Sequence, residues 1–207
     1  PGICDDTRAL AEVLSLARAF RQADLKPVGT VILCGNVGEE GLGDLRGVKE
    51  LFRTLEIDAF ISLDHWGVDE ILLDATGSKR YKVTYRAEGG HSFGAFGKPN
   101  PIHAMGRAIH SIAQLHGLKE PKTTFNVGVV SGGTSINSIP CEASMLIDIR
   151  SNSAQELAKL EATILEMCKA AAPAETEHWN HTDSVKIDIE LLGDRPAGSQ
   201  PHDGLMV

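Results

Sequence analysis

Three acidic features near the start of the chain could take part in chemistry: Asp5-Asp6, Glu39-Glu40 and Asp64. The Glu39-Glu40 pair follows an apolar run and a glycine-rich turn, and Asp64 ends the next apolar run. Ligand sites of open α/β sheets lie beyond the carboxyl ends of the strands, so these carboxylates are expected close together. Paired carboxylates repel one another unless a cation or a shared proton holds them, and such a cluster therefore suits divalent metals.

Each acidic feature also has an ordinary structural explanation. Acidic pairs in turns are usually solvated surface or helix caps, and Asp5-Asp6 taken alone favours a cap for the helix that follows it. The three features together favour a two-metal centre, which needs a bridging carboxylate, terminal ligands and a base that activates water. Carboxylate and imidazole ligands suit zinc, or failing that manganese or cobalt.

The elements around these carboxylates alternate between helix and strand. The pattern predicts helices over 6–24 and 44–55, buried strands over 28–34 and 59–63, and a glycine-rich turn over 35–43. This alternation is typical of an α/β sheet with crossover helices.

After Gly77 the pattern changes to that of a second domain. Strands are predicted over 81–87, 124–130, 143–149 and 185–191, and helices over 102–115 and 153–171. The order β-α-β-β-α-β is that of a ferredoxin-like fold. The fold class expected is therefore α/β: part of a catalytic α/β domain over 1–78, an inserted α+β domain over 79–192, and a return segment over 193–207.

Composition excludes several classes of function. The net charge of −8 and the pI near 5.5 argue against nucleic acid as a partner, because phosphates need clustered Lys and Arg. No apolar run approaches the ~20 residues needed to span a bilayer, so no membrane association is expected. The four scattered cysteines predict reduced, mostly buried thiols and a cytoplasmic protein.

Six segments, in the same order, resemble the M20 metallopeptidase family. The glycine-rich turn over 36–47 resembles the Glu-Glu signature of that family, the segment 2–6 its bridging aspartate, and Ser62-Leu63-Asp64 its later carboxylate ligand. The segments 89–92 with 100–102, 132–140 and 148–150 resemble the family's lid (dimerisation) domain. The family includes peptidase T-like tripeptidases, glutamate carboxypeptidases and acetylornithine deacetylase.

The resemblance implies a role for each of seven residues. Glu39 would be the general base that takes a proton from a metal-activated water. Three carboxylates would hold two divalent metal ions, zinc first, in which Asp5 bridges both ions and the terminal ligands are Glu40 and Asp64. His91 would stabilise the oxyanion in the active site of a partner subunit, Asn137 would also act across a homodimer, and Arg150 would hold the substrate carboxylate. The resemblance also implies a cis peptide bond between Asp5 and Asp6.

The chain departs from the family pattern in two places. An M20 enzyme also needs an upstream His-x-Asp and a downstream His, and neither fits in these 207 residues. The sequence therefore predicts an incomplete and inactive piece of a protein roughly twice as long.

The function expected is metal-dependent hydrolysis of amide bonds in small peptides or N-acyl amino acids. The resemblance implies that Asp rather than Glu at position 64 favours a peptidase over a deacylase. The alternative is a non-catalytic dimerisation or binding module derived from such an enzyme. A nucleophilic hydrolase using Ser92 or Ser135 has little support, because the sequence contains no Gly-x-Ser-x-Gly elbow.

Overall fold

The computed structural model describes residues 3–64, 69–182, 184–201 and 203. The chain forms two compact units, one of residues 1–72 with 202–207 and the other of residues 73–201. Gly2, which begins the segment compared with the bridging aspartate, lies outside the described residues, as do positions 202 and 204–207 of the predicted return segment. The assignment of the units to a catalytic and a lid domain stays a prediction.

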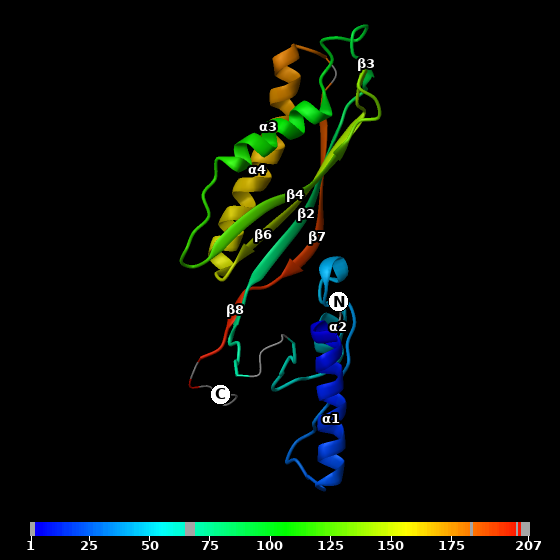
Figure 1. Cartoon of the computed structure of the whole chain (residues 1–207). Helices are drawn as coiled ribbons and strands as arrows, with labels where there is room; N and C mark the ends of the chain where they lie inside the picture. Colours follow the sequence, from blue (N-terminus) through cyan, green and yellow to red (C-terminus); the bar gives the residue numbers. More distant parts are fainter. Residues whose placement is uncertain (1–2, 65–68, 183, 202, 204–207) are drawn as a thin grey trace. The chain divides into compact units, whose positions relative to one another are not determined.

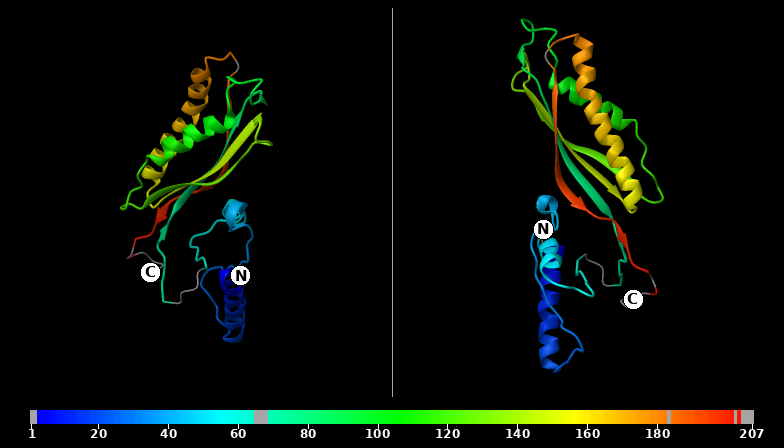
Figure 2. Two further views of the ribbon diagram at one scale, coloured as in Figure 1. Left: turned by 45° about the horizontal axis from the view of Figure 1, so that its top comes forward. Right: turned by 180° about the vertical axis from the view of Figure 1, so that it is seen from behind.

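The second unit is a four-stranded antiparallel sheet with two helices on one face (Figures 1 and 2). Its strands are β2 (Gly77–Arg86), β4 (Thr123–Gly132), β6 (Glu142–Ser151) and β7 (Lys186–Arg195), in the order β4-β6-β2-β7. Its helices are α3 (Pro101–Ala113) and α4 (Ala154–Trp179). The predicted β-α-β-β-α-β order and ferredoxin-like fold are confirmed.

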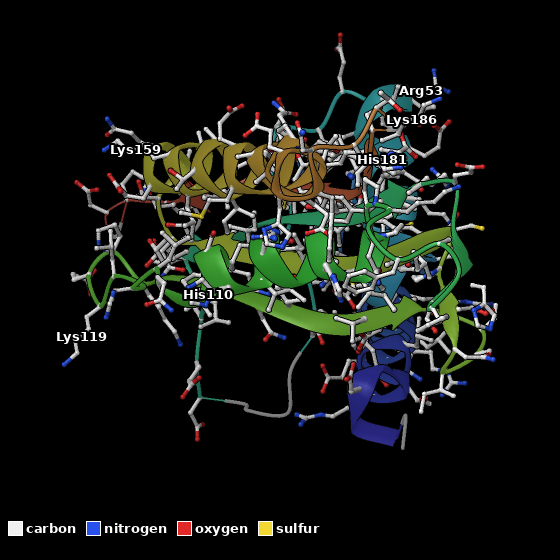
Figure 3. All side chains as sticks on the ribbon, turned by 90° about the horizontal axis from the view of Figure 1, so that it is seen from above. Arg53, His110, Lys119, Lys159, His181 and Lys186 are labelled. Atoms are coloured by element: carbon white, nitrogen blue, oxygen red, sulfur yellow. The ribbon has the colours of Figure 1, made fainter. Side chains whose placement is uncertain are left out.

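Alternation along the strands builds the core between the sheet and the helices. Odd-numbered residues of β2 and β6, such as Val83, Tyr85 and Ile149, are fully buried toward the helices. Ile112 of α3 and Ile164 of α4 meet them from the other side. Figure 3 shows α3 and α4 side by side above the sheet. Burying each such side chain stabilises the fold by about 1.5–3 kcal/mol.

Local sequence signals place the ends of both helices. Asn100 caps α3 by accepting a hydrogen bond of 2.9 Å from the backbone N–H of Ile102, and Pro101 occupies the first helical position. Ser153 caps α4 through the N–H of Glu156. Helix α4 ends at Trp179 and is capped by Asn180, whose φ of 47° is left-handed.

Two short ladders extend the main strands at opposite ends of the sheet (Figure 1). Strand β1 (Asp74–Ala75) pairs with β8 (Gly198–Ser199) before β2 begins and after β7 ends. Strand β3 (Gly90–His91) pairs with β5 (Ser138–Ile139) beyond the far end of β2. These two-residue strands are below the length at which alternation in a sequence is recognisable.

The regular secondary structure described in the first unit is helical. It contains the short helical segments η1 (Ile3–Thr7) and η2 (Gly41–Gly43) and the helices α1 (Arg8–Gln22) and α2 (Arg46–Thr54). The two helices confirm the predictions over 6–24 and 44–55.

The strands predicted over 28–34 and 59–63 are wrong, because the described residues of this unit form no strand. Apolar side chains of both segments are exposed, with Val31 at 49% and Ile61 at 72%. A buried parallel strand needs strand neighbours and helices on both faces, and among its described residues this unit supplies neither.

Two further expectations concern membranes and cysteines. No helix in the described part of the chain is long and apolar enough to cross a bilayer. Among the described residues, Cys34, Cys141 and Cys168 are free thiols that form no disulfide. Of these three, Cys168 is buried and the other two are exposed, so the expectation of mostly buried thiols is wrong for Cys34 and Cys141.

Candidate functional site

Four carboxylates of the first unit act on one another electrostatically. Partial desolvation and the negative charge of Asp64 raise the pKa of Asp6, with smaller contributions from Asp5 and Glu39. A hydrogen bond from the backbone N–H of Ala9 opposes this rise, so Asp6 also serves the start of α1 as a cap would. The peptide bond between Asp5 and Asp6 is cis, as the resemblance implied. The structure thus gathers carboxylates from three distant segments of the sequence.

The glycine-rich turn that carries Glu39 and Glu40 folds back closely on itself. A side chain at Gly43 would place its Cβ 2.6 Å from the carbonyl oxygen of Gly38, which no real Cβ contact allows. Gly38 itself has a φ of 74°, a conformation that glycine adopts without strain. Glu40 begins the η2 turn, and its carbonyl accepts a hydrogen bond of 2.8 Å from the N–H of Gly43. Both carboxylates therefore stand on a loop whose shape depends on its glycines.

The chemistry of these donors fits a divalent cation, but the described residues do not form a complete metal site. Desolvation and then the negative charges of neighbouring carboxylates raise the pKa of Asp6, and a bound cation would neutralise that negative charge. Among the described residues, however, no three His, Cys, Asp or Glu side chains are grouped as a metal ion would require. Two of the three predicted metal ligands, Asp5 and Asp64, thus lie near Asp6, but the described carboxylates are not arranged around one point.

In the second unit, His91 and Asn137 lie together at the end of the sheet. His91 pairs with Ser138 in the ladder of β3 and β5, and the N–H of Ser92 donates to the carbonyl of Asn137 at 2.9 Å. The hydroxyl of Ser135 donates to the side-chain oxygen of Asn137. Beside this ladder lies a pocket of about 550 Å³, lined by the backbone of the glycines Gly132 and Gly133 among others. Two predicted site residues that are 46 positions apart in sequence are therefore neighbours.

The hydrogen bonds of His91 determine which ring nitrogen carries the proton. Nδ1 accepts from the backbone N–H groups of Phe93 and Gly94, each at 3.3 Å. An accepting nitrogen has no proton, so the neutral ring carries its proton on Nε2. The side chain is exposed, and its Nε2–H is the kind of donor that stabilises an oxyanion.

Arg150 lies at the opposite end of the same sheet. It is near the end of β6, where its Nε donates to Asp148 at 2.7 Å. The Nε of Arg80 donates to the other oxygen of Asp148 at 3.0 Å. The nine residues from Glu142 to Arg150 span about 26 Å of extended strand. The structure therefore does not bring Arg150 together with His91 and Asn137 within one chain.

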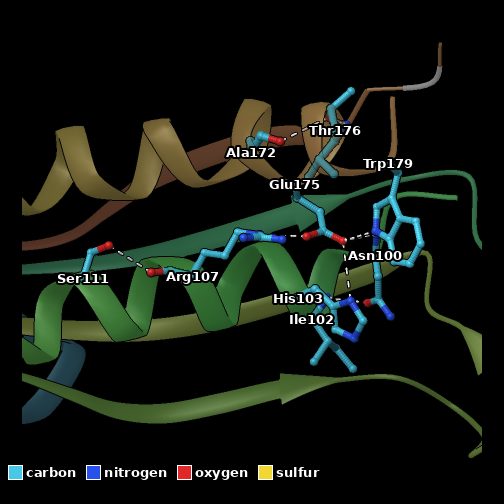
Figure 4. A network of polar contacts seen from close by, with 10 residues as sticks. Asn100, Ile102, His103, Arg107, Ser111, Ala172, Glu175, Thr176 and Trp179 are labelled. Atoms are coloured by element: carbon cyan, nitrogen blue, oxygen red, sulfur yellow. Dashed lines mark hydrogen bonds and ion pairs between the residues drawn. The ribbon is translucent and has the colours of Figure 1, made fainter. Parts of the chain in front are cut away.

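A buried carboxylate on α4 anchors the loop that follows His91 (Figure 4). Glu175 is 0% exposed and accepts hydrogen bonds from the backbone N–H of Asn100, from Nε of Arg107 at 2.8 Å and from the indole N–H of Trp179 at 2.9 Å. The Trp179 ring also packs edge-on against Phe96 of the loop, with ring centroids 5.2 Å apart. Burial opposes ionisation of Glu175, but these partners outweigh it and hold the pKa of the carboxyl below its ordinary value. The loop over 92–100 is thus held at its far end and at its middle.

Neither Glu175 nor Asp148 was predicted to act near the site. A signal exists for Glu175, because it continues the apolar stripe of α4 formed by Ile164, Cys168 and Ala171. A single carboxylate on a buried stripe indicates an internal partner of opposite charge. The signal for Asp148 in the sequence is weaker. Alternation along the strand places it on the same face as Arg150, and that is the whole of the indication.

Comparison with known families identifies the second unit. Residues 74–176 match the family model of the peptidase dimerisation domain, M20_dimer. This part of the chain is an M20 peptidase dimerisation domain. The match covers the main strands β2, β4 and β6, the helix α3 and most of α4. The resemblance found in the sequence over 89–150 is thereby confirmed. No curated protein sequence matches the chain significantly.

Solved structures share the fold of the dimerisation domain and of the rest of the chain. The aminopeptidase PepT of Bacillus cereus has a TM-score of 0.71 and 22% identity, covering 97% of this chain and 51% of its own. A tripeptidase of Staphylococcus aureus has a TM-score of 0.68 and 19% identity, with the same coverage of 97% and 51%. A hydantoinase/carbamoylase-family amidase of Burkholderia multivorans matches at 0.51 and 16% identity, over 61% of this chain and 30% of its own. This chain thus spans about half the length of the two peptidases.

Proposed function

We propose that the whole protein is an M20-type hydrolase that cleaves amide bonds in small peptides or N-acyl amino acids. The match of residues 74–176 to an M20 peptidase dimerisation domain carries this proposal. The gathering of Asp5, Asp6, Glu39 and Asp64 in the other unit supports it. Asp at position 64 favours peptides over N-acyl amino acids as substrates, and the reduced cysteines favour a cytoplasmic location.

The proposed chemistry uses residues of both units. Two divalent metal ions, zinc first and manganese or cobalt as alternatives, would be held by Asp5, Glu40 and Asp64 and would polarise the scissile carbonyl as Lewis acids. Glu39 would accept the proton of the attacking water and pass it to the leaving amine.

Lid residues would bind the substrate and the developing charge. His91 would donate its Nε2–H to the oxyanion, with Asn137 beside it, and Arg150 would hold the substrate carboxylate with its planar fork. Because His91 and Arg150 lie at opposite ends of the sheet, they would act in the sites of different subunits.

The decisive experiment for this function is removal of metal. The whole protein is expected to hydrolyse an unblocked dipeptide, to lose that activity on dialysis against a chelator, and to regain it when Zn²⁺ is added back. Hydrolysis should be followed by release of the free amino acid. Activity that survives in protein shown to be free of metal would contradict the proposal.

The alternative function is a dimerisation or binding module without catalysis. It is favoured by the finding that no three metal-ligating side chains are grouped among the described residues. If the whole protein neither binds metal nor hydrolyses dipeptides or N-acetyl amino acids, this alternative replaces the hydrolase.

We further propose that the protein forms a homodimer through edge strand β4. This strand is hydrogen-bonded to β6 on one side only within the described sheet, and Val129 and Val130 on it are 51% and 57% exposed. An exposed apolar edge strand is a ready template for pairing with a second copy.

A charge on that edge is expected to dissociate the dimer. Val129→Lys should raise the dimer dissociation constant about tenfold or more, because pairing would desolvate the ammonium group. Analytical ultracentrifugation measures the constant. The matched control is Leu191→Lys on the other edge strand, β7, where Leu191 is 48% exposed, and it should leave the dimer intact. A dimer unaffected by Val129→Lys would rule out this edge.

A further inference from the structure

The ring of His91 is held by the backbone of the loop that follows it. The N–H groups of Phe93 and Gly94 donate to its Nδ1, each at 3.3 Å, and the N–H of Ala95 donates to its carbonyl oxygen at 2.8 Å. Among the described residues, the two bonds at Nδ1 are the only hydrogen bonds of the ring, and the residue is exposed. The direction of the ring and the position of its proton therefore depend on the conformation of the loop over 92–100.

The internal contacts of this loop are weak. The N–H of Phe96 donates to the carbonyl of Phe93 at 3.4 Å, which is long for a hydrogen bond. The N–H of Lys98 donates to the carbonyl of Ala95 at 3.2 Å. The ion pair of Lys98 with Glu88 at 2.5 Å is partly solvated, and pairs of this kind contribute little. The loop therefore depends on support from outside itself.

Trp179 at the end of α4 supplies that support (Figure 4). Its ring packs edge-on against that of Phe96, with the centroids 5.2 Å apart and an angle of 80° between the ring planes. Its indole N–H donates to Oε1 of the buried Glu175 at 2.9 Å, and the N–H of Asn100 donates to the same oxygen at 3.2 Å. One side chain thus contacts the middle of the loop directly and its far end through a shared acceptor.

The last turn of α4, which carries Trp179, is itself tied to the rest of the domain. The hydroxyl of Thr176 accepts a hydrogen bond of 3.1 Å from the N–H of Val185, which is buried just before β7. The same hydroxyl donates to the carbonyl of Ala172 at 3.2 Å. Trp179 therefore offers the loop a fixed point of attachment.

We propose that Trp179 is a positioning residue for His91 and acts on it through Phe96 and the loop. By holding the loop, it holds the N–H groups of Phe93 and Gly94 against Nδ1 and so keeps the ring proton on Nε2. The consequence for catalysis rests on the proposed function: the Nε2–H is set in place for the oxyanion before the reaction begins. A donor that is already in place needs no reorganisation at the moment of reaction.

The first test follows the ring of His91 without any reference to hydrolysis. Nitrogen NMR of the imidazole is recorded on the 207-residue chain at a pH where histidine rings are ordinarily neutral. The unaltered chain should show a protonated Nε2 and an unprotonated Nδ1. Phe96→Ala removes the aromatic contact from the loop, and Trp179→Leu removes it from the helix. Each should lower the ratio of the Nε2–H form to the Nδ1–H form about 2–10-fold, the equivalent of one edge-to-face contact.

Phe93→Ala is the matched control within the same loop. Phe93 is 89% exposed and holds His91 through its backbone N–H, which alanine keeps, so the ratio should stay that of the unaltered chain. The double variant of Phe96→Ala with Trp179→Leu should lower the ratio no further than Trp179→Leu alone, because the two rings form a single contact.

Three results would overturn the proposal. They are equal amounts of the two forms in the unaltered chain, an unchanged ratio in Phe96→Ala, and an equal fall in Phe93→Ala. Phe96 is 77% exposed and lies outside the hydrophobic core, so Phe96→Ala keeps the proposal testable even if Trp179→Leu does not fold.

Hydrolysis of a dipeptide by the whole protein then separates this role from the proposed function. Phe96→Ala should lower kcat by about twofold or more with KM nearly unchanged, the pattern expected when an interaction made only in the transition state is weakened. A fall in the NMR ratio without a fall in kcat would refute the consequence for catalysis. If the whole protein hydrolyses no dipeptide, the proposed function fails, and the NMR ratios still decide whether Trp179 positions His91.

Discussion

Glu39→Gln is expected to lower the rate of amide hydrolysis by the whole protein by about 10²–10⁴-fold, the usual contribution of a general base. Gln has nearly the size of Glu but cannot accept a proton at neutral pH. The proposed metal ligands Asp5, Glu40 and Asp64 are unchanged, so metal content should stay nearly constant. The measurement is kcat/KM on a dipeptide, with metal analysis of the same sample.

The control for this variant is Glu50→Gln on α2. Glu50 is an exposed residue of the same unit and pairs with Arg53 at 2.6 Å, and its loss should leave kcat/KM unchanged. An unchanged rate in Glu39→Gln would remove Glu39 from the mechanism. Loss of the metal together with the rate would make Glu39 a ligand rather than the base.

Glu175→Ala is expected to destabilise the dimerisation domain by about 3–5 kcal/mol, the cost of breaking a buried ion pair by removing one partner. The change leaves the guanidinium of Arg107, the indole N–H of Trp179 and the N–H of Asn100 without their buried acceptor. Chemical denaturation followed by circular dichroism measures the free energy of unfolding.

Glu166→Ala, on the same helix, is the matched control. Glu166 is 72% exposed and pairs with Lys169 one turn away, so its removal should change the free energy of unfolding by about 0.5 kcal/mol or less. A loss below about 1 kcal/mol in Glu175→Ala would mean that water replaces the carboxylate, and the anchoring of the loop would then need another explanation.

The dimerisation domain was predictable because its strands and helices each bury one face. Alternation over 81–87 and 143–149 indicated β2 and β6, and the pattern over 153–171 indicated α4, which runs eight residues further to Trp179. Pro173 lies inside that extension, where a proline ordinarily suggests a helix end.

The predicted strands of the other unit failed for a physical reason. The run over 28–34 is mostly apolar, as in a strand buried on both faces, but such a strand is stable only among neighbours that hydrogen-bond to it. Local sequence reports the preference of a segment and not whether its partners are in place.

The candidate site was predictable in part. Residue types and order sufficed to predict that Asp5, Glu39 and Asp64 would be close to one another. The negative charge of each contributes to the raised pKa of Asp6, which agrees with that proximity. The arrangement of Arg80 and Arg150 on Asp148 depends on strand register, which pairs Arg80 with Asp148 across 68 positions of sequence. Nothing local to any of the three residues indicates that pairing.

The register of β6 also limits how this segment can change during evolution. Ile149 faces the core and Asp148 and Arg150 face the other way, so an insertion or deletion of one residue within the strand would exchange the two sets. Two charged groups would enter the apolar layer and a core residue would leave it. Relatives should therefore differ in this strand by substitution, and differences in length should be confined to the loops at its two ends.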